Sequence, residues 1–305
     1  VFARDYWTDH AADSYATPVD TANKVVTVAS AEELALFAKE VTDDGKAYKD
    51  YTLNITSDVD LGEYLWKPIN GYNRLSGIVV NGNGHTIRNM KVRGCTNSSL
   101  YGAGFIGDIN GAVTVKDIAF DGADVFFVNY AKPQFAGNVG GIVLGCTTLF
   151  ENVTVTNSSI WGYGKIGILL GMGADPGVKV TFKDCVSKNN TIHAAYDMGG
   201  LAGMIQRGNG VDNASVENCT VENITVDYYN KGTYVDVKGT ATLKSNDQPS
   251  GSDVTRAIDG KYLDESGYYW CAYGDYYVSY GHSSYDAPVE GYSKCLANSE
   301  YCVNK

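Results

Sequence analysis

A six-residue pattern recurs five times along the chain, and it constrains the fold more than any other feature of the sequence. The pattern reads apolar, charged, Asn or Asp, apolar, any residue, apolar, with one weaker copy at 182–187. Its third position falls at Asn89, Asp117, Asn152, Asp184 and Asn218, in steps of 28, 35, 32 and 34 residues. Self-similarity at a period of about 20–50 residues predicts a solenoid, in which each repeat forms one structural unit.

A second, glycine-rich marker precedes each of the later copies. It occupies residues 104–107, 140–143, 167–170 and 199–203, always upstream of the six-residue pattern. Two markers in the same order support a true repeat. We expect these glycines where the backbone turns with a positive φ or packs closely against another segment.

The repeats have the composition of strands rather than helices. Segments 112–120, 151–160 and 178–186 alternate apolar and polar residues and are rich in β-branched side chains. A unit of about 30 residues with three short strands matches one turn of a parallel β-helix. The predicted fold class is therefore all-β, a right-handed single-stranded parallel β-helix, with the hand taken from the usual crossover rule. Extra length in a unit predicts projecting loops, here at 126–138 and 191–198.

The pattern also assigns directions to its side chains. Its apolar positions are predicted to point inward and to stack on their equivalents in the next turn. The Asn/Asp position is predicted to form a structural ladder of side-chain hydrogen bonds between turns, as in stacked cross-strand arrays. Cys185 and Cys219 share one template position and are predicted to be buried, stacked and unreactive.

The two ends of the chain differ from the repeats. Ser30 and Glu33 form a predicted capping box ahead of an amphipathic helix at about 31–42, which would close the first turn. The polar segment 239–253 suggests a boundary. The predicted domains are therefore 1–238, the β-helix with its N-terminal cap, and 239–305, a tyrosine-rich C-terminal cap or small appended β-region. In that region Cys271 is expected to pair with Cys295 or Cys302, with the connectivity left open.

Several motifs occur in a familiar order. Trp66-Lys67-Pro68-Ile69 is followed by Gly82-Asn83-Gly84-His85-Thr86-Ile87, and the glycine-rich markers come later. Over residues 1 to about 230 the chain resembles secreted or surface-anchored β-helix proteins of gut bacteria with GLUG-type repeats, which share their architecture with pectin-lyase-like enzymes. The resemblance implies export, lipid or cell-wall attachment, and surface roles such as adhesion. Its motifs are structural, so it implies no activity.

Charge and composition exclude several partners. With 24 basic and 35 acidic residues the chain carries a formal charge of −11, which disfavours nucleic acid and anionic membranes. The sequence has no run of 18 apolar residues, so no transmembrane segment is predicted, and residues 1–10 lack the apolar core of a signal peptide. We expect an extracellular or cell-surface monomer without a cofactor.

The sequence predicts no metal site. Its four histidines show no ligand spacing. Asp58, Asp60 and Glu63 crowd one segment and could attract calcium, but this segment lacks the glycine spacing of an EF-hand. Solvation of a strand end is the favoured interpretation.

No catalytic residue is predicted either. His85 could be a general base, but a solenoid corner needs none, and we favour a turn residue whose ring bonds the backbone of the neighbouring unit. Asp117 and Asp184 lie two units apart, about 9.6 Å by strand spacing, near the separation of glycosidase carboxylates. Asn152 stands between them, so a structural role is favoured for both.

The aromatic C-terminal segment supplies the candidate ligand-binding residues. A platform for a glycan or for a host or bacterial surface protein is one interpretation, and a packed cap over the last turn is the favoured alternative. The candidates are Tyr268, Tyr269, Trp270, Tyr273, Tyr276 and Tyr277. The expected function is a non-enzymatic adhesion or glycan-binding module. The rivals are a polysaccharide lyase or glycoside hydrolase and a structural stalk.

Overall fold

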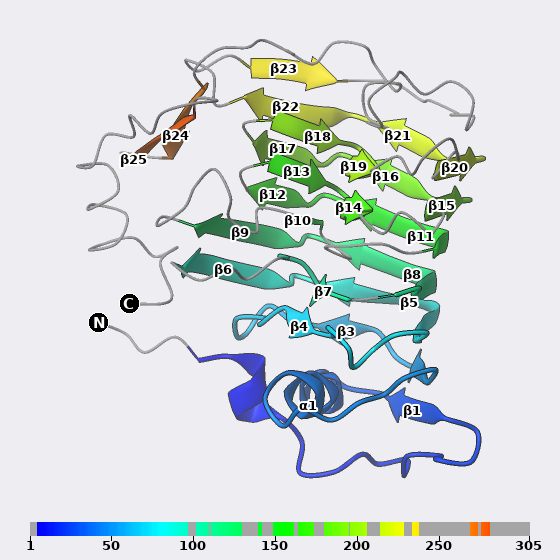
Figure 1. The fold of residues 1–305 in the computed structure, drawn as a ribbon. Helices are drawn as coiled ribbons and strands as arrows, with labels where there is room; N and C mark the ends of the chain where they lie inside the picture. Colours follow the sequence, from blue (N-terminus) through cyan, green and yellow to red (C-terminus); the bar gives the residue numbers. More distant parts are fainter. Residues whose placement is uncertain are drawn as a thin grey trace.

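The computed structural model gives an all-β protein with parallel sheets and, in the part it describes, one α-helix (Figure 1). The predicted all-β class is confirmed. The structure describes residues 5–96, 102–109, 111–129, 140–141, 149–161, 164–173, 180–194, 196–205, 214–228, 234–237, 269–273 and 276–280. No helix within these ranges is long and apolar enough to cross a membrane.

The largest sheet collects one or two strands from each repeat. Its order is β1 (Val25–Val28), β2 (Thr52–Ile55), β5 (Val79–Arg88), β8 (Thr114–Asp121), β11 (Leu149–Thr156), β15 (Val180–Lys183) and β20 (Ala214–Glu217). Beside this path lie β3 (Val59–Asp60), β16 (Val186–Lys188) and β21 (Thr220–Glu222). Every pairing in this sheet is parallel, so equivalent residues of successive repeats lie side by side.

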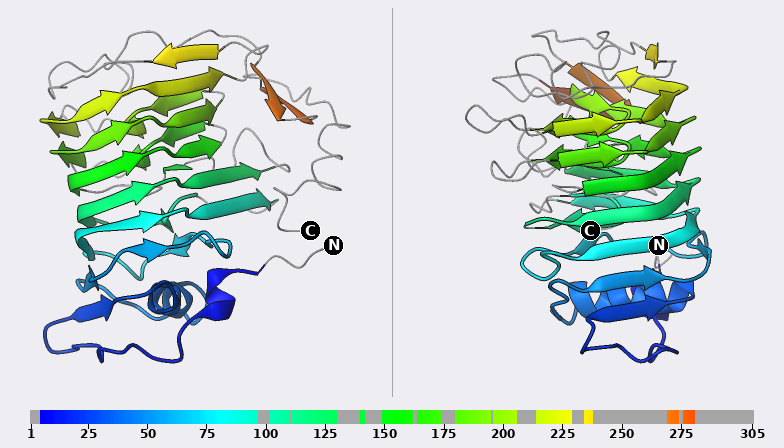
Figure 2. Two further views of the ribbon diagram at one scale, coloured as in Figure 1. Left: turned by 180° about the vertical axis from the view of Figure 1, so that it is seen from behind. Right: turned by 90° about the vertical axis from the view of Figure 1, so that its right-hand side faces the viewer.

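A second sheet follows the first in each repeat. Its order is β6 (Lys91–Thr96), β9 (Asp124–Asn129), β12 (Ser159–Trp161), β17 (Thr191–Ala194), β22 (Ile224–Tyr228) and β23 (Tyr234–Val237). Only β23 is antiparallel to its neighbour. The views from behind and from the side show the strands of both sheets layered in the same direction (Figure 2).

The glycine-rich markers lie in three smaller parallel sheets. These are β10 (Gly140–Gly141), β13 (Gly164–Gly167) and β18 (Tyr196–Gly199); β14 (Leu170–Gly173) and β19 (Ala202–Ile205); and β4 (Ile69–Asn70) and β7 (Ile106–Asp108). Gly141, Gly167 and Gly199 lie opposite one another. Both roles expected for these glycines occur, each in a different copy of the marker. Gly104 has a positive φ of 142°, and Gly167 packs closely against another segment.

Asn/Asp residues form two columns along the stack, where the sequence predicted one. The first contains Asn83, Asp117, Asn152, Asp184 and Asn218, and the second contains Asn89, Gly122, Asn157, Asn189 and Asn223. The prediction for Asn89 was wrong, because Arg88 lies opposite Asp121 and Asn89 therefore precedes Gly122 in the second column. Asp117 faces instead the bulge at 82–84.

The columns exist because each strand turns sharply at these positions. Every Asn or Asp in them has a φ between 49° and 57°, in the left-handed region. Asn and Asp occupy that region more readily than other residues with a side chain. Asn152 Nδ2 donates to Asp117 Oδ1 at 2.9 Å, and Asn218 Nδ2 donates to Asp184 Oδ1 at 2.6 Å. The side chains thus tie neighbouring parallel strands together while their backbones make the bend.

The apolar positions form a continuous buried core. Phe150 and Phe182 stack with ring centroids 5.1 Å apart and planes 5° apart, and both are 0% exposed. Val115 and Val216 continue their row in the neighbouring strands. Burying such side chains supplies most of the favourable free energy of folding. Cys185 and Cys219 belong to this core as free thiols, so the prediction that they are buried is confirmed.

One row of the core is polar and fully hydrogen-bonded. Ser158 and Asn190 are 3% and 1% exposed. Asn190 accepts from Ser158 N and donates to Val155 O, both at 2.9 Å, and Ser158 Oγ accepts from Ala123 N. Because each buried group has a partner, the row avoids the penalty of about 1–3 kcal/mol for an unsatisfied one.

The helix α1 (Ala31–Thr42) lies across one end of the strand stack (Figures 1 and 2). Its bounds match the predicted helix. Ser30 Oγ accepts from Glu33 N at 3.2 Å, as a cap should. The reciprocal half of the predicted capping box was wrong, because the Glu33 carboxylate accepts instead from Ala29 N and Ala16 N. Glu33 therefore ties the N-terminal segment to the helix.

Both segments predicted as loops contain strands. Residues 126–129 belong to β9, and residues 191–194 and 196–198 belong to β17 and β18. Residues 130–138 lie outside the described part. The predicted loops rested on the extra length of these repeats, and that length does not show which of its residues form strands. This correction matters, since these strands build the candidate site.

Candidate functional site

The parallel register of the second sheet lines up aromatic residues of successive strands in one row. Val125, Ile160 and Ile192 are buried, and successive residues of a strand alternate between its two faces. The next residue in each of these strands, after the buried one, is Phe126, Trp161 or His193. The parallel register places these residues in one row, with a charged residue at each end: Arg93, Phe126, Trp161, His193 and Asp227.

A row of hydrogen-bonding residues lies two positions before the aromatic row in each strand. It consists of Lys91, Asp124, Ser159, Thr191 and Thr225. Lys91 is exposed and the other four are half-buried, so this face is accessible to solvent. Ser159 Oγ donates to Asp124 Oδ1 at 3.4 Å. The second Asn column borders this row on its other side. The three rows combine flat apolar groups with donors and acceptors.

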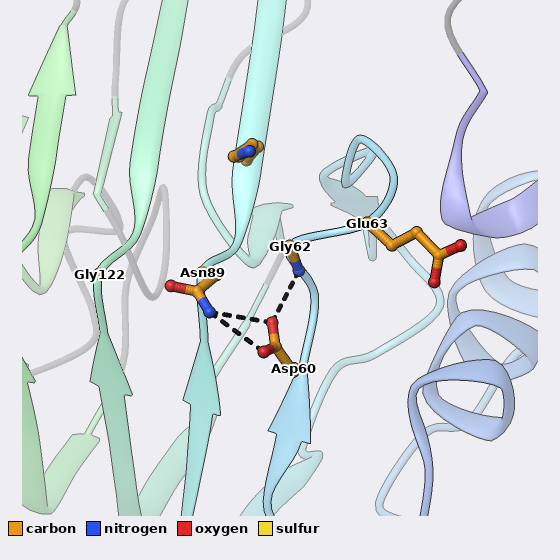
Figure 3. A pocket seen from close by; sticks show the side chains of 6 residues that line it. Asp60, Gly62, Glu63, Asn89 and Gly122 are labelled. Carbon is orange, nitrogen blue, oxygen red and sulfur yellow. Dashed lines mark hydrogen bonds between the residues drawn. The ribbon is translucent and has the colours of Figure 1, made fainter.

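A pocket of about 510 Å³ opens where the polar row meets the second Asn column (Figure 3). It is lined by Asp60, Gly62, Glu63, Asn89, Lys91 and Gly122. These residues come from β3 and the segment after it, from the β5–β6 junction, and from the β8–β9 junction. The pocket is thus built from three successive repeats, and Lys91, one of its lining residues, begins β6 of the second sheet.

The polar groups of the pocket are fixed by one another. Asn89 Nδ2 donates to both oxygens of Asp60, at 3.0 and 3.1 Å, and Gly62 N donates to Asp60 Oδ1 at 2.9 Å. Glu63 points away from this pair (Figure 3). It accepts a hydrogen bond from Tyr64, and this bond raises the pKa of the tyrosine. Asp60 and Asn89 therefore present a rigid wall.

His85 lies beside a charged cluster next to the first column. It belongs to β5 and is not at a turn, and its Nδ1 lies 3.3 Å from Asp58 Oδ1. The predicted bond from its ring to a neighbouring backbone was therefore wrong. Asp58 also accepts from Thr86 N at 3.0 Å and from Arg88 Nη1 at 2.9 Å. Asp58 thus interacts with His85, Thr86 and Arg88 together, and these contacts join adjacent repeats.

The acid dependence of stability tests this cluster. Two hydrogen bonds to the carboxylate lower the pKa of Asp58 from 3.8 to about 2. The larger effect comes from the backbone N–H of Thr86, and the next from the side chain of Arg88. A depressed folded-state pKa stabilises the fold above the unfolded value and loses that effect as the pH falls through the folded value. We expect Asp58→Asn to lower the melting temperature near pH 5, with the difference shrinking between pH 3.8 and about 2. Melting curves against pH measure it.

Asp13→Asn is the matched control, because Asp13 is exposed. Its difference from the wild type should stay near zero throughout this pH range. A constant deficit of Asp58→Asn down to pH 2 would show that the carboxylate contributes no charge-dependent stability.

The two carboxylates considered as a catalytic pair belong to the ladder, and the described residues hold no metal-binding group. Asp117 accepts from Asn152 and Asp184 accepts from Asn218, so both act as ladder acceptors. No group of three or more His, Cys, Asp or Glu residues suited to a metal ion occurs in the ranges that the structure covers. Asp58 and Asp60 point their carboxylates at protein donors instead.

The tyrosine-rich residues lie partly outside the described structure. Tyr269, Trp270 and Tyr273 belong to β24 (Tyr269–Tyr273), which pairs in antiparallel fashion with β25 (Tyr276–Tyr280). That second strand contains Tyr276 and Tyr277. Tyr268, Cys295 and Cys302 lie outside the described residues, as do the side chains of both strands. The platform, the cap and the disulfide therefore stay predictions.

Sequence reasoning missed the aromatic row and the pocket. The signal for the row was present, because its members follow the second Asn column at a constant offset of four residues, from Gly122 to Phe126 and from Asn157 to Trp161. Comparisons with family models, curated proteins and solved structures find no match to this chain. The resemblance to GLUG-type repeat proteins stays a prediction.

Proposed function

We propose that the chain is a right-handed single-stranded parallel β-helix that serves as an extracellular, non-enzymatic glycan-binding module. The parallel register of five successive repeats supports the β-helix. The row at Phe126, Trp161 and His193 carries the functional proposal. Its members occupy one register position on the consecutive strands β9, β12 and β17, beside the accessible polar row.

The chemistry of sugars fits this face. A pyranose ring has apolar C–H faces and a rim of hydroxyls, so it is recognised by a flat aromatic group beside donors and acceptors. Aromatic side chains supply such a face at a small entropic cost. Ser159, Thr191 and Thr225 supply hydroxyls one position away. Because the rows run across several strands, they suit a linear chain of sugars better than one compact ligand.

The charge distribution supports binding rather than a role as an inert stalk. The chain carries a net charge of −11, yet the aromatic row contains one Arg and one Asp at its ends and no charge at Phe126 and Trp161. A spacer gains nothing from aromatic residues that recur at one register position of a sheet. Aromatic residues are the side chains most enriched in binding hot spots.

Replacing Trp161 with alanine is expected to weaken glycan binding at least about tenfold, because a hot-spot residue contributes about 2 kcal/mol or more. A glycan array followed by calorimetry on the strongest hit measures it. Thr181→Ala is the control, since Thr181 lies in the large sheet instead. The proposal is wrong if the wild type binds no glycan, or if Trp161→Ala binds as the wild type does.

A further inference from the structure

One glycine interrupts the second Asn column, and the pocket lies at that interruption. In the later repeats each Asn donates to the one before it, with Asn189 Nδ2 at 3.5 Å from Asn157 Oδ1 and Asn223 Nδ2 at 3.0 Å from Asn189 Oδ1. Gly122 occupies the equivalent place after Asn89 and has no amide to donate. The ladder is therefore broken at a single residue.

The break leaves the oxygen of Asn89 directed at open space. Its Nδ2 is used by Asp60, whereas Oδ1 points toward Gly122 (Figure 3). A Cβ placed on Gly122 would lie 3.0 Å from that oxygen, so a side chain there would fill this wall of the pocket. The glycine thus exposes an oriented acceptor that the regular repeat would cover.

Lys91 places a donor at the same pocket. It is exposed, and none of the described residues forms an ion pair with it. Its backbone is fixed, since Lys91 O accepts from Trp66 N at 2.7 Å. The pocket is therefore lined by an amide oxygen that can accept from one sugar hydroxyl and by an ammonium group that can donate to another.

The charges around the pocket select against acidic ligands. Asp60 and Glu63 carry two negative charges against the single positive charge of Lys91. A carboxylated sugar would add a further like charge, which a site of this sign disfavours. An uncharged sugar keeps the hydrogen bonds without that penalty.

We propose that the break at Gly122 is a subsite for one uncharged sugar residue of the bound glycan, with Asn89 Oδ1 accepting from one hydroxyl and Lys91 Nζ donating to the next. This inference rests on the proposed glycan-binding function and adds the place and charge class of the ligand. The subsite would hold one end of the glycan, and the sugars that follow would bind along the aromatic row.

Gly122→Asn tests the subsite by completing the ladder. Gly122 has a φ of 67°, and Asn adopts 52° to 57° at the other positions of this column, so the variant is expected to fold with an unchanged or higher melting temperature. Binding to neutral polysaccharides (a glucan, a mannan and a xylan) should fall at least about tenfold, because one subsite is filled. Isothermal calorimetry measures the affinity of the wild type and of Gly122→Asn.

The controls separate this inference from the proposed function. Asn218→Gly breaks the first Asn/Asp column, which does not border the candidate site, and should leave affinity unchanged. The wild type should bind a neutral polysaccharide more tightly than polygalacturonate. If Gly122→Asn binds as the wild type does while Trp161→Ala loses affinity, the subsite is wrong and the proposed function stands. If the wild type binds none of these polysaccharides, both are wrong.

A second variant guards against failure of the first to fold. Lys91→Met keeps an unbranched, flexible side chain that is one atom shorter, and it removes the charge. It should lose about tenfold in affinity for the neutral polysaccharide, since it removes a charged hydrogen-bond donor. Unchanged binding by a folded Lys91→Met variant would overturn the subsite on its own.

Discussion

Replacing Gly167 with alanine is expected to destabilise the fold by about 4 kcal/mol or more, the range reserved for exceptional substitutions. A Cβ at this position would lie 2.1 Å from Leu170 O and 2.5 Å from Gly203 N, and both neighbours are backbone atoms. Backbone cannot move aside as the end of a side chain can, so the segments at β13 and β19 must separate. Denaturant unfolding followed by circular dichroism measures the loss.

Gly84→Ala is the control that isolates this effect. Gly84 has a φ of 82° and nothing within 4 Å of its Cβ position, so alanine there suffers only conformational strain. That strain costs about 1–2 kcal/mol. A loss at Gly167 no larger than that at Gly84 would show that the two segments are not in close contact.

The sequence was sufficient to predict the repeat and its inward side chains. Strands with one buried face must alternate, and a repeated strand must present the same residues to its neighbours, so both properties are written in the residue order. Phe150, Phe182 and Val216 fall on one row for this reason. Cys185 and Cys219 were placed in the core by the same argument.

The ladder was only partly predictable, because two columns satisfy one pattern. Asp117 and Gly122 lie five residues apart in the same repeat, and each follows an apolar and a charged residue. Local sequence therefore could not say to which column Asn89 belongs. The step of 28 residues from Asn89 to Asp117 was the warning, since the observed columns advance by 32 to 35 residues.

The candidate site was missed for a different physical reason. Phe126 and His193 fall in segments that were predicted as loops from the extra length of their repeats, so their place in strands was not expected. The pocket depends on the absence of a side chain at Gly122, which shows its meaning only after the register is known. Functional positions of this kind break a local rule, and the break is visible only against the regular repeat.

Replacing Phe182 with alanine is expected to cost about 3–5 kcal/mol of stability, as for other buried aromatic residues. Phe182 is 0% exposed and stacks on Phe150 at 5.1 Å. Strands β11, β15 and β20 fix the backbone on both sides through parallel pairings, so the cavity cannot collapse by moving one strand alone. Unfolding in urea, monitored by circular dichroism, gives the change in free energy.

Further variants of β15 distinguish the effect of core packing from that of strand propensity. Thr181→Ala changes the neighbouring, half-buried residue of the same strand and should cost at most about 1 kcal/mol. Phe182→Leu should fall between the two variants, because leucine leaves a smaller cavity. Equal losses for Phe182→Ala and Thr181→Ala would contradict a stacked aromatic core. Because each repeat is stabilised mainly by its neighbours, a break at Phe182 should loosen β11 and β20 together, which amide hydrogen exchange in both strands would detect.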